Sequence, residues 1–141
     1  MGYKKLTRML RKLGRTLTVG IHEDAGNHDG GDLTVAGIGS VHEFGSGNVP
    51  ARPFLRPTFD TNQNKYVRNL SRALGKDVDK KRQPDRTLNA LGASIVADVQ
   101  GAIRSRIPPP LAESTVAQKG SSTPLIDSGQ LINSITHKVR K

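Results

Sequence analysis

The sequence predicts an α+β domain in which a small, mainly antiparallel sheet packs against two main helices, with long loops or arms between them. Three observations support this. Apolar and polar residues alternate over 16–22, as in a half-buried strand. Apolar residues recur every three or four positions over 60–75 and 85–107, as in helices. Proline- and glycine-rich stretches separate these segments. The length of 141 residues suits a single domain over 1–141.

The first element is an amphipathic helix over 4–13. Its apolar positions follow the helical repeat: Leu6, Met9, Leu10 and Leu13. Basic residues fill the positions between them and predict a basic surface: Lys4, Lys5, Arg8, Arg11 and Lys12. Gly14 stands where a C-terminal cap belongs, and Leu17, Val19 and Ile21 then alternate as one face of a strand.

Residues 23–32 combine glycine, asparagine and aspartate without apolar periodicity, which predicts a mobile loop. The segment after it has apolar residues spaced by threes up to Phe44, and Thr34 is a suitable N-cap. This spacing favours a helix, although Gly37 and Gly39 each cost a helix about 1 kcal/mol.

Residues 45–58 contain three prolines, which predict an extended arm or loop. Phe54 and Leu55 lie between prolines, and large apolar side chains on an arm need cover from water. Two kinds of cover are open: the protein's own core, or a neighbouring subunit. The second alternative predicts a subunit interface formed by Arg52, Phe54, Leu55 and Arg56.

The helix that begins near Asp60 has Tyr66, Leu70 and Leu74 on one side, and 76–86 reads as a charged linker. The clearest helix runs from about residue 85 to the three prolines at 108–110, which end it. Residues 108–126 are predicted to be a loop, with Ser114 a candidate cap for a short turn. Asp127 is a candidate cap for the turn that begins at Ser128. Residues 135–139 suggest a final strand.

The residues that could carry chemistry form no recognisable catalytic pattern. The pairs His22-Glu23 and His42-Glu43 lack the H-E-x-x-H spacing of a zinc helix, so we expect surface or cap hydrogen bonds from them. The glycine-rich stretch 37–47 lacks the lysine and hydroxyl of a phosphate-binding loop. Cysteine is absent, which excludes disulfides and thiolate sites. We expect no enzyme activity, no cofactor and no metal.

The formal net charge is +10, from 22 Lys and Arg against 12 Asp and Glu, which calls for an acidic partner. For the basic helix three roles stay open: contact with DNA phosphates, contact with an acidic protein, or a solvated face. Because only five aromatic residues are present, stacking of bases on aromatic side chains is disfavoured. Apolar runs are far shorter than the roughly 20 residues that span a bilayer, and the N-terminus lacks a secretory signal pattern. We expect a soluble protein with no membrane partner.

Two segments, 42–60 and 110–139, resemble the phage virion morphogenesis, neck and tail-completion proteins, including the Mu-type tail-completion and lambdoid tail-component groups. The family pattern has H-E-F-G, I-P-A-R-P-F-L-R-P, K-G, P-L-I-D-T-G and L-x-x-S-I. It maps onto His42 to Gly45, Val49 to Pro57, Lys119-Gly120, Pro124 to Gly129, and Leu131 with Ser134-Ile135. Ser128 replaces the family's threonine. The matches cover about a third of the chain, in the family's order.

This resemblance implies a structural protein of a tailed phage that completes the tail or joins it to the head. It further implies a homo-oligomeric ring, a hexamer, around the DNA channel. The implied partners are neck, connector or tail proteins, with non-specific contact to packaged DNA. The protein would be made in the host cytoplasm and reside in the virion. The alternative function is that of a basic architectural DNA-binding protein, which the net charge and the N-terminal helix suggest.

Overall fold

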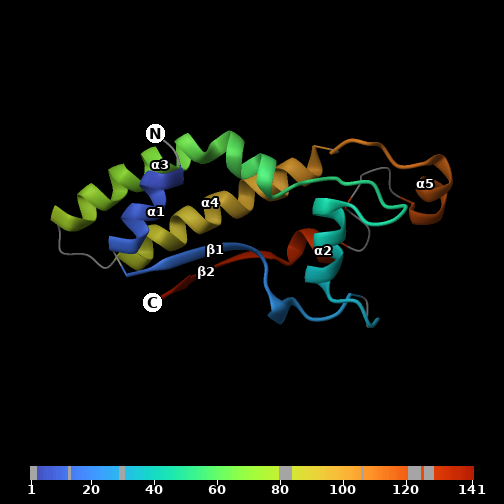
Figure 1. The fold of residues 1–141 in the computed structure, drawn as a ribbon, viewed down its shortest axis with the longest axis horizontal. Helices are drawn as coiled ribbons and strands as arrows, with labels where there is room; N and C mark the ends of the chain where they lie inside the picture. The colour runs from blue at the N-terminus through green and yellow to red at the C-terminus, as the bar shows by residue number, and fades with distance from the viewer. Residues whose placement is uncertain are drawn as a thin grey trace.

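The computed structural model describes residues 3–12, 14–28, 31–79, 84–105, 107–120, 125 and 129–141. Its elements are, in chain order, α1 (Tyr3–Lys12), β1 (Thr16–Ile21), the 3-10 turn η1 (Glu23–Ala25), α2 (Val35–Phe44), α3 (Arg56–Asp79), α4 (Pro84–Arg104), α5 (Glu113–Lys119), α6 (Gln130–Asn133) and β2 (Ile135–Arg140). The molecule is elongated, with α3 and α4 along its length and the two strands below them (Figure 1). The predicted α+β class is confirmed.

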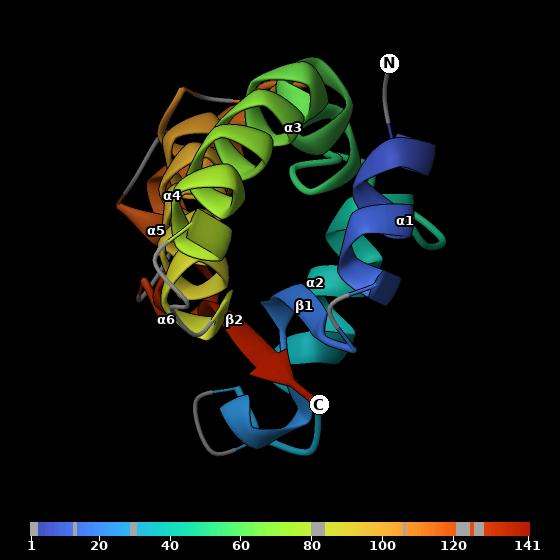
Figure 2. The same cartoon turned by 90° about the vertical axis from the view of Figure 1, so that its left-hand side faces the viewer.

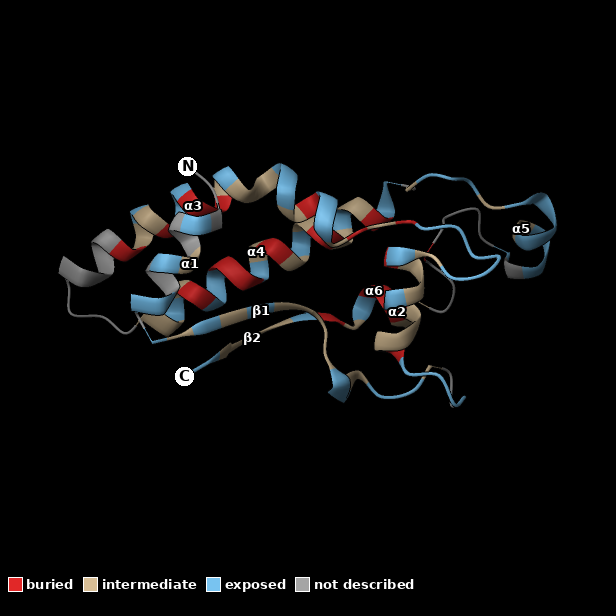
Figure 3. Cartoon of the chain, in the orientation of Figure 1, coloured by how far each residue is buried: buried red, intermediate tan, exposed pale blue. Residues whose placement is uncertain are grey.

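Helix α4 is the centre of the packing. It lies between α3 and the sheet, so the sheet rests on α4 and α3 covers α4 from another side. Its inner face is a buried apolar stripe, red in Figure 3: Leu88, Leu91, Ile95, Val99 and Ile103. The facing stripe of α3 is also buried: Tyr66, Val67, Leu70 and Leu74. Both stripes follow the spacing from which the helices were predicted.

The sheet pairs strands from opposite ends of the chain. β1 and β2 are antiparallel, in a register that runs from Thr16 opposite Arg140 to Ile21 opposite Ile135. β2 lies so close to α4 that a Cβ placed on Gly92 would come within 2.8 Å of the Cβ of His137. Viewed along the length of the molecule, α4 lies on one side, and α1 and α2 lie toward the opposite side (Figure 2).

The N-terminal half follows its predicted outline. The Thr34 hydroxyl accepts a hydrogen bond from the Gly37 N–H at 3.0 Å, so Thr34 caps α2 as predicted. Gly14 has a positive φ of 59° after α1, and its N–H bonds to the Arg11 carbonyl. Within the predicted loop 23–32, the described residues include η1.

Three predicted boundaries were wrong. Helix α3 begins at Arg56 rather than near Asp60 and continues to Asp79, inside the predicted linker 76–86, while α4 already begins at Pro84. Pro57 is tolerated there because a helix needs no N–H donor in its first turn. The predicted loop 108–126 contains α5, whose N-cap residue is Ala112 and not Ser114. Asp127 and Ser128 lie outside the described residues. None of the described helices is long and apolar enough to cross a membrane.

Candidate functional site

The first region of family resemblance is organised around Glu43, near the end of α2. Its side chain is buried, and its carboxylate accepts three backbone hydrogen bonds. Oε2 accepts from the N–H groups of Phe54 and Leu55 at 2.8 and 3.0 Å, and Oε1 accepts from that of Arg56 at 3.0 Å. Because the first N–H groups of a helix have no partner within it, Glu43 caps α3 from a different helix. The interpretation of the second His-Glu pair as a source of cap hydrogen bonds is confirmed for Glu43.

Arg52 connects the two regions of resemblance. Its N–H donates to the His42 carbonyl at 2.6 Å. Its guanidinium donates to the carbonyl oxygens of Pro109 and Pro110, through Nε at 2.7 Å and Nη2 at 3.3 Å. Only 5% of Arg52 is exposed. The segment before α3 is thereby held against the segment after α4, more than fifty residues later.

The arm or loop predicted over 45–58 is non-helical up to Leu55, as expected, and ends where α3 begins at Arg56. Phe54 is completely buried among the core residues, and its carbonyl accepts a hydrogen bond from the Thr58 hydroxyl at 2.8 Å. Arg52 is buried as well. The protein's own core therefore covers this segment, which was the first of the two alternatives. Leu55 is partly buried and Arg56 is exposed. Their contact with another subunit stays a prediction.

A groove with a volume of about 710 Å³ lies beside this segment. Four parts of the chain form its walls: β1 with Val19 and Ile21, α2 with Ala36, Gly39, Ser40, Glu43 and Phe44, the segment around the start of α3 with Phe54, Leu55, Arg56, Phe59 and Asp60, and α4 with Ile95 and Val99. Most of these side chains are apolar. Sequence patterns did not indicate the groove, because each pattern describes one element and the groove needs four.

The predicted basic surface is exposed where the structure describes its side chains. Lys4, Arg8, Arg11 and Lys12 are exposed on α1, and the side chain of Lys5 lies outside the described part. The end of α1, the start of α4 and the C-terminus share one end of the molecule (Figure 1). Arg15 there pairs with Asp85 at 2.6 Å. The exposed basic residues at this place form what we term the basic end: Arg11, Lys12, Arg86, Arg140 and Lys141.

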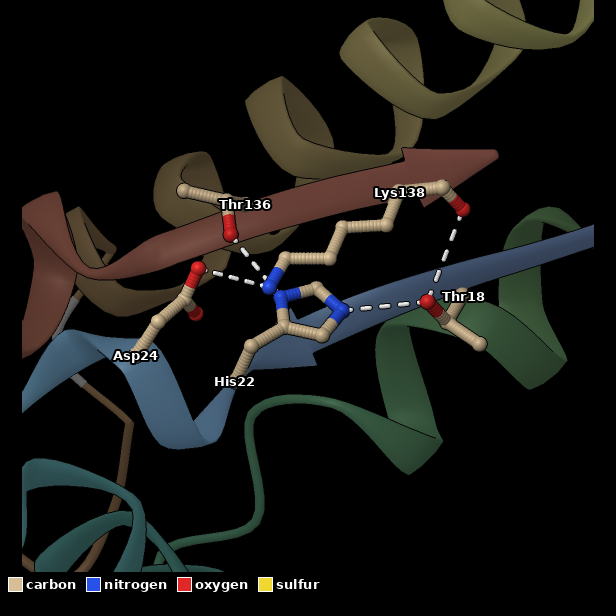
Figure 4. A network of polar contacts seen from close by, with 5 residues as sticks. All are labelled: Thr18, His22, Asp24, Thr136 and Lys138. Carbon is tan, nitrogen blue, oxygen red and sulfur yellow. Dashed lines mark hydrogen bonds and ion pairs between the residues drawn. The ribbon is translucent and has the colours of Figure 1, made fainter. Parts of the chain in front are cut away.

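A polar network joins the two strands and the turn after β1 (Figure 4). The ring of His22 bonds to the Thr18 hydroxyl at 3.0 Å and to the Thr136 hydroxyl at 2.9 Å. Lys138 pairs with Asp24 at 2.6 Å. Burial, reinforced by the nearby Lys138 charge, lowers the pKa of His22. The hydrogen bond from Lys138 lowers the pKa of Asp24. Because Asp24 binds Lys138, it does not orient His22 as the carboxylate of a catalytic triad would.

A second polar cluster lies between α3 and α4. Asp98 accepts hydrogen bonds from Lys65 and from the hydroxyl of the buried Tyr66, the latter at 2.7 Å. Desolvation is the largest single influence on the Asp98 carboxyl and opposes its ionisation. The two hydrogen bonds together outweigh it, so the pKa of Asp98 lies below its usual value. Burial and the bond to Asp98 raise the pKa of Tyr66. This cluster fastens the two long helices to each other.

Among the described residues, no three His, Cys, Asp or Glu side chains are grouped so that they could hold a metal ion. Comparisons with protein-family models, with curated proteins and with solved structures found no match to this chain.

Proposed function

We propose that this chain is a non-enzymatic structural subunit of a tailed bacteriophage, located at the neck or upper tail and assembled as a ring around the DNA channel. The observation that carries the proposal is that two charged residues in the first resembling segment have a structural role. Glu43 and Arg52 direct their charged groups to the chain's own backbone. Such residues maintain a shape, which is what an assembly subunit requires.

The order of the resembling segments also supports the proposal. Residues 42–60 and 110–139 are far apart in sequence, yet Arg52 of the first segment donates a hydrogen bond to the carbonyl of Pro110, the first residue of the second. Residues shared across a family are expected to meet in this way when they specify a common fold. The apolar groove and its exposed rim offer surface for contacts between subunits.

The test is the composition of purified virions. Quantitative mass spectrometry should find the chain in particles at a fixed copy number, and six per particle is the number implied by the resemblance. Labelling with a specific antibody in electron micrographs should mark the junction of head and tail. A chain abundant in infected cells but absent from purified particles would overturn the proposal.

The basic end supports a second candidate, a basic architectural DNA-binding protein. Five exposed basic residues lie at one end of the molecule. They belong to α1, to α4, to β2 and to position 141 after it. Such a surface attracts phosphates irrespective of base sequence. This candidate requires tight duplex binding at physiological salt without any virion partner.

A further inference from the structure

In the described part of the chain the sheet has two strands, so β2 is paired with β1 on one side and forms an edge on the other. The Thr18 hydroxyl lies 3.5 Å from the carbonyl oxygen of Lys138, its partner in the register, so this carbonyl points toward β1 (Figure 4). In an antiparallel pair, residues whose N–H and C=O groups point to the partner strand alternate with residues whose groups point away. The backbone groups of His137 and Val139 therefore point away from β1, to the outer edge of β2.

This outer edge can accept a further strand. Among the described residues, no backbone hydrogen bond outside the sheet involves His137 or Val139, and both residues are partly exposed. Helix α4 packs against the face of β2, where Gly92 meets the His137 side chain, and packing on a face leaves the hydrogen-bonding direction open. Unpaired N–H and C=O groups along an edge are a template for another strand.

The chemistry of the edge favours a polypeptide as its occupant. The edge presents N–H donors and C=O acceptors in alternation, and an extended peptide supplies the complementary groups in the same spacing. The phosphates of DNA offer acceptors, so they would leave the carbonyl oxygens of the edge without donors.

The charges of β2 favour an acidic polypeptide. Residues 134–141 contain three lysines or arginines and no aspartate or glutamate. Lys138 is already paired with Asp24. Arg140 and Lys141 are exposed, and neither takes part in the ion pairs found among the described residues. Two positive charges thus remain available beside the edge.

The position of Arg140 on the sheet sets the pattern of the added strand. Because the His137 side chain lies on the face toward α4, the side chains of Lys138 and Arg140 lie on the opposite face. Alternate side chains of an added strand would lie beside them there, where opposite charges stabilise a pair of strands. A second copy of β2 would instead bring like charges together, which is how natural edge strands avoid pairing with themselves.

We propose that the outer edge of β2 binds an extended acidic segment of a partner protein as a third strand. The backbone of this segment pairs with His137 and Val139, and its carboxylates lie beside Arg140 on the face of the sheet away from α4. The contact depends on the strand edge alone, so it does not require that the protein belong to a virion.

The experiment uses the full chain and a short peptide of alternating glutamate and valine with blocked ends. NMR titration measures its affinity, and amide hydrogen exchange locates its binding site. A peptide with lysine in place of glutamate is the control for charge. Two further peptides carry N-methyl groups on all valines or on all glutamates. One of these two should lose binding, because only alternate N–H groups of an added strand point to β2.

The variants test the charge and the edge separately. Arg140→Glu should weaken binding of the acidic peptide by roughly five-fold or more, because repulsion replaces an exposed ion pair. Arg68→Glu, at an exposed position of α3, is the matched control and should bind as the wild type does. Val139→Pro removes an N–H group that points away from β1, so it should weaken binding while the pairing with β1 remains. Circular dichroism monitors folding, and the methylated peptides test the edge without any variant.

We expect the acidic peptide to bind and the lysine peptide not to bind. Exchange of the His137 and Val139 amide hydrogens should slow, whereas that of Lys138, which is already directed to β1, should change little. Absence of binding, equal affinity for the two charged peptides, or binding that survives both methylations would overturn the inference. So would duplex DNA that protects the same two amides, or oligomers of the free chain that dissociate on Arg140→Glu in analytical ultracentrifugation. The composition of virions tests the proposed function separately.

Discussion

Glu43 shows how one buried carboxylate can replace the local cap that a helix start lacks. Residues 53–57 contain two prolines and no serine, threonine, aspartate or asparagine that could cap α3 from its own N-terminus. The carboxylate comes instead from the previous helix and satisfies three N–H groups at once. The negative charge is also favourable at the positive end of the α3 dipole.

Removal of this carboxylate should destabilise the fold. Glu43→Ala leaves three N–H donors near the buried start of α3 without their partner, and we expect the free energy of unfolding to fall by about 2–4 kcal/mol. The free energy of unfolding of Glu43→Gln should lie between the values for the alanine variant and the wild type. Urea denaturation measures the difference, and Glu23→Ala, at an exposed position, is the control. Equal stability of the Glu43 and Glu23 variants would contradict the capping role.

The two phenylalanines Phe44 and Phe54 are a natural pair for testing where the core ends. Phe54 is completely buried, whereas Phe44 is 69% exposed. Phe54→Ala should therefore cost about 3–5 kcal/mol, because apolar burial decreases and a cavity is left behind. Phe44→Ala should change stability by less than about 0.5 kcal/mol. Thermal and urea unfolding distinguish this result from cover by a neighbouring subunit alone, for which the two changes would be equally mild in the isolated protein.

At the level of single residues, the sequence predicted local contacts and missed the distant ones. Thr34 was recognisable because a cap and its helix are adjacent in sequence. The partners of Glu43 and Arg52 were not, since they are about eleven and fifty-seven residues away. A proline-bracketed Phe54 looks equally suitable for an arm and for a core. Only its three-dimensional surroundings distinguish the two.

The close contact between β2 and α4 is possible because Gly92 of α4 has no side chain. At Gly92 an added Cβ would meet the His137 Cβ at 2.8 Å, an atom that cannot move without its strand. Gly92→Ala should therefore destabilise the protein by about 1–3 kcal/mol, despite the better helix propensity of alanine. In the same helix, Gly101 has open space around it. Gly101→Ala should raise stability by up to about 1 kcal/mol, and denaturant unfolding of both variants tests the contrast.

The network around His22 should make the pairing of the strands sensitive to pH. Its pKa in the folded protein lies below the ordinary value of 6.5, chiefly because of burial. The unfolded chain then binds a proton at His22 more readily than the folded chain, so acid favours unfolding. The stability that neutral His22 contributes is present above pH 6.5 and is lost as the pH falls through the folded pKa. Melting temperatures of wild type and His22→Gln should converge in acid, and parallel pH profiles would contradict this.

Element types were predictable where a long periodic pattern existed. The stripes of α3 and α4, the alternation in β1 and the terminal strand all gave the right structure. Helix ends were less predictable, because α3 begins at a cap supplied by another helix and α5 has no long apolar stripe. The pairing of β1 with β2 involves strands more than a hundred residues apart, and no local signal sets its register.

For the binding of an acidic partner, the distribution of charge over the whole molecule matters more than the net charge. The basic end gathers basic residues of α1, α4 and β2 at one end of the molecule. In the groove, by contrast, the charge of Arg56 is offset by Glu43 and Asp60. Composition predicted an acidic partner but not where it would bind. The groove itself was beyond sequence reasoning, since it exists only when four elements are assembled.

Compensation of the positive charge should come from acidic neighbours in the virion rather than from recognition of a DNA sequence. A ring of six copies would carry about 60 positive charges, and their mutual repulsion persists after screening by salt. The few aromatic residues and the lack of a base-reading motif disfavour sequence specificity. We therefore expect similar, weak binding to duplexes of any sequence at physiological salt, and tighter binding to a purified neck or tail partner.

Two pairs of variants test which basic residues contribute to DNA binding. Arg11→Gln with Arg140→Gln removes two charges from the basic end, and Arg68→Gln with Arg104→Gln removes two exposed charges farther along α3 and α4. In a salt series on duplex DNA, the first pair should weaken binding more. It should also reduce the slope of log affinity against log salt by up to roughly 0.9 for each phosphate that the protein no longer neutralises. Equal effects of the two pairs would show that only net charge matters. Tight binding to one DNA sequence at physiological salt, together with absence of the chain from virions, would favour the DNA-binding alternative.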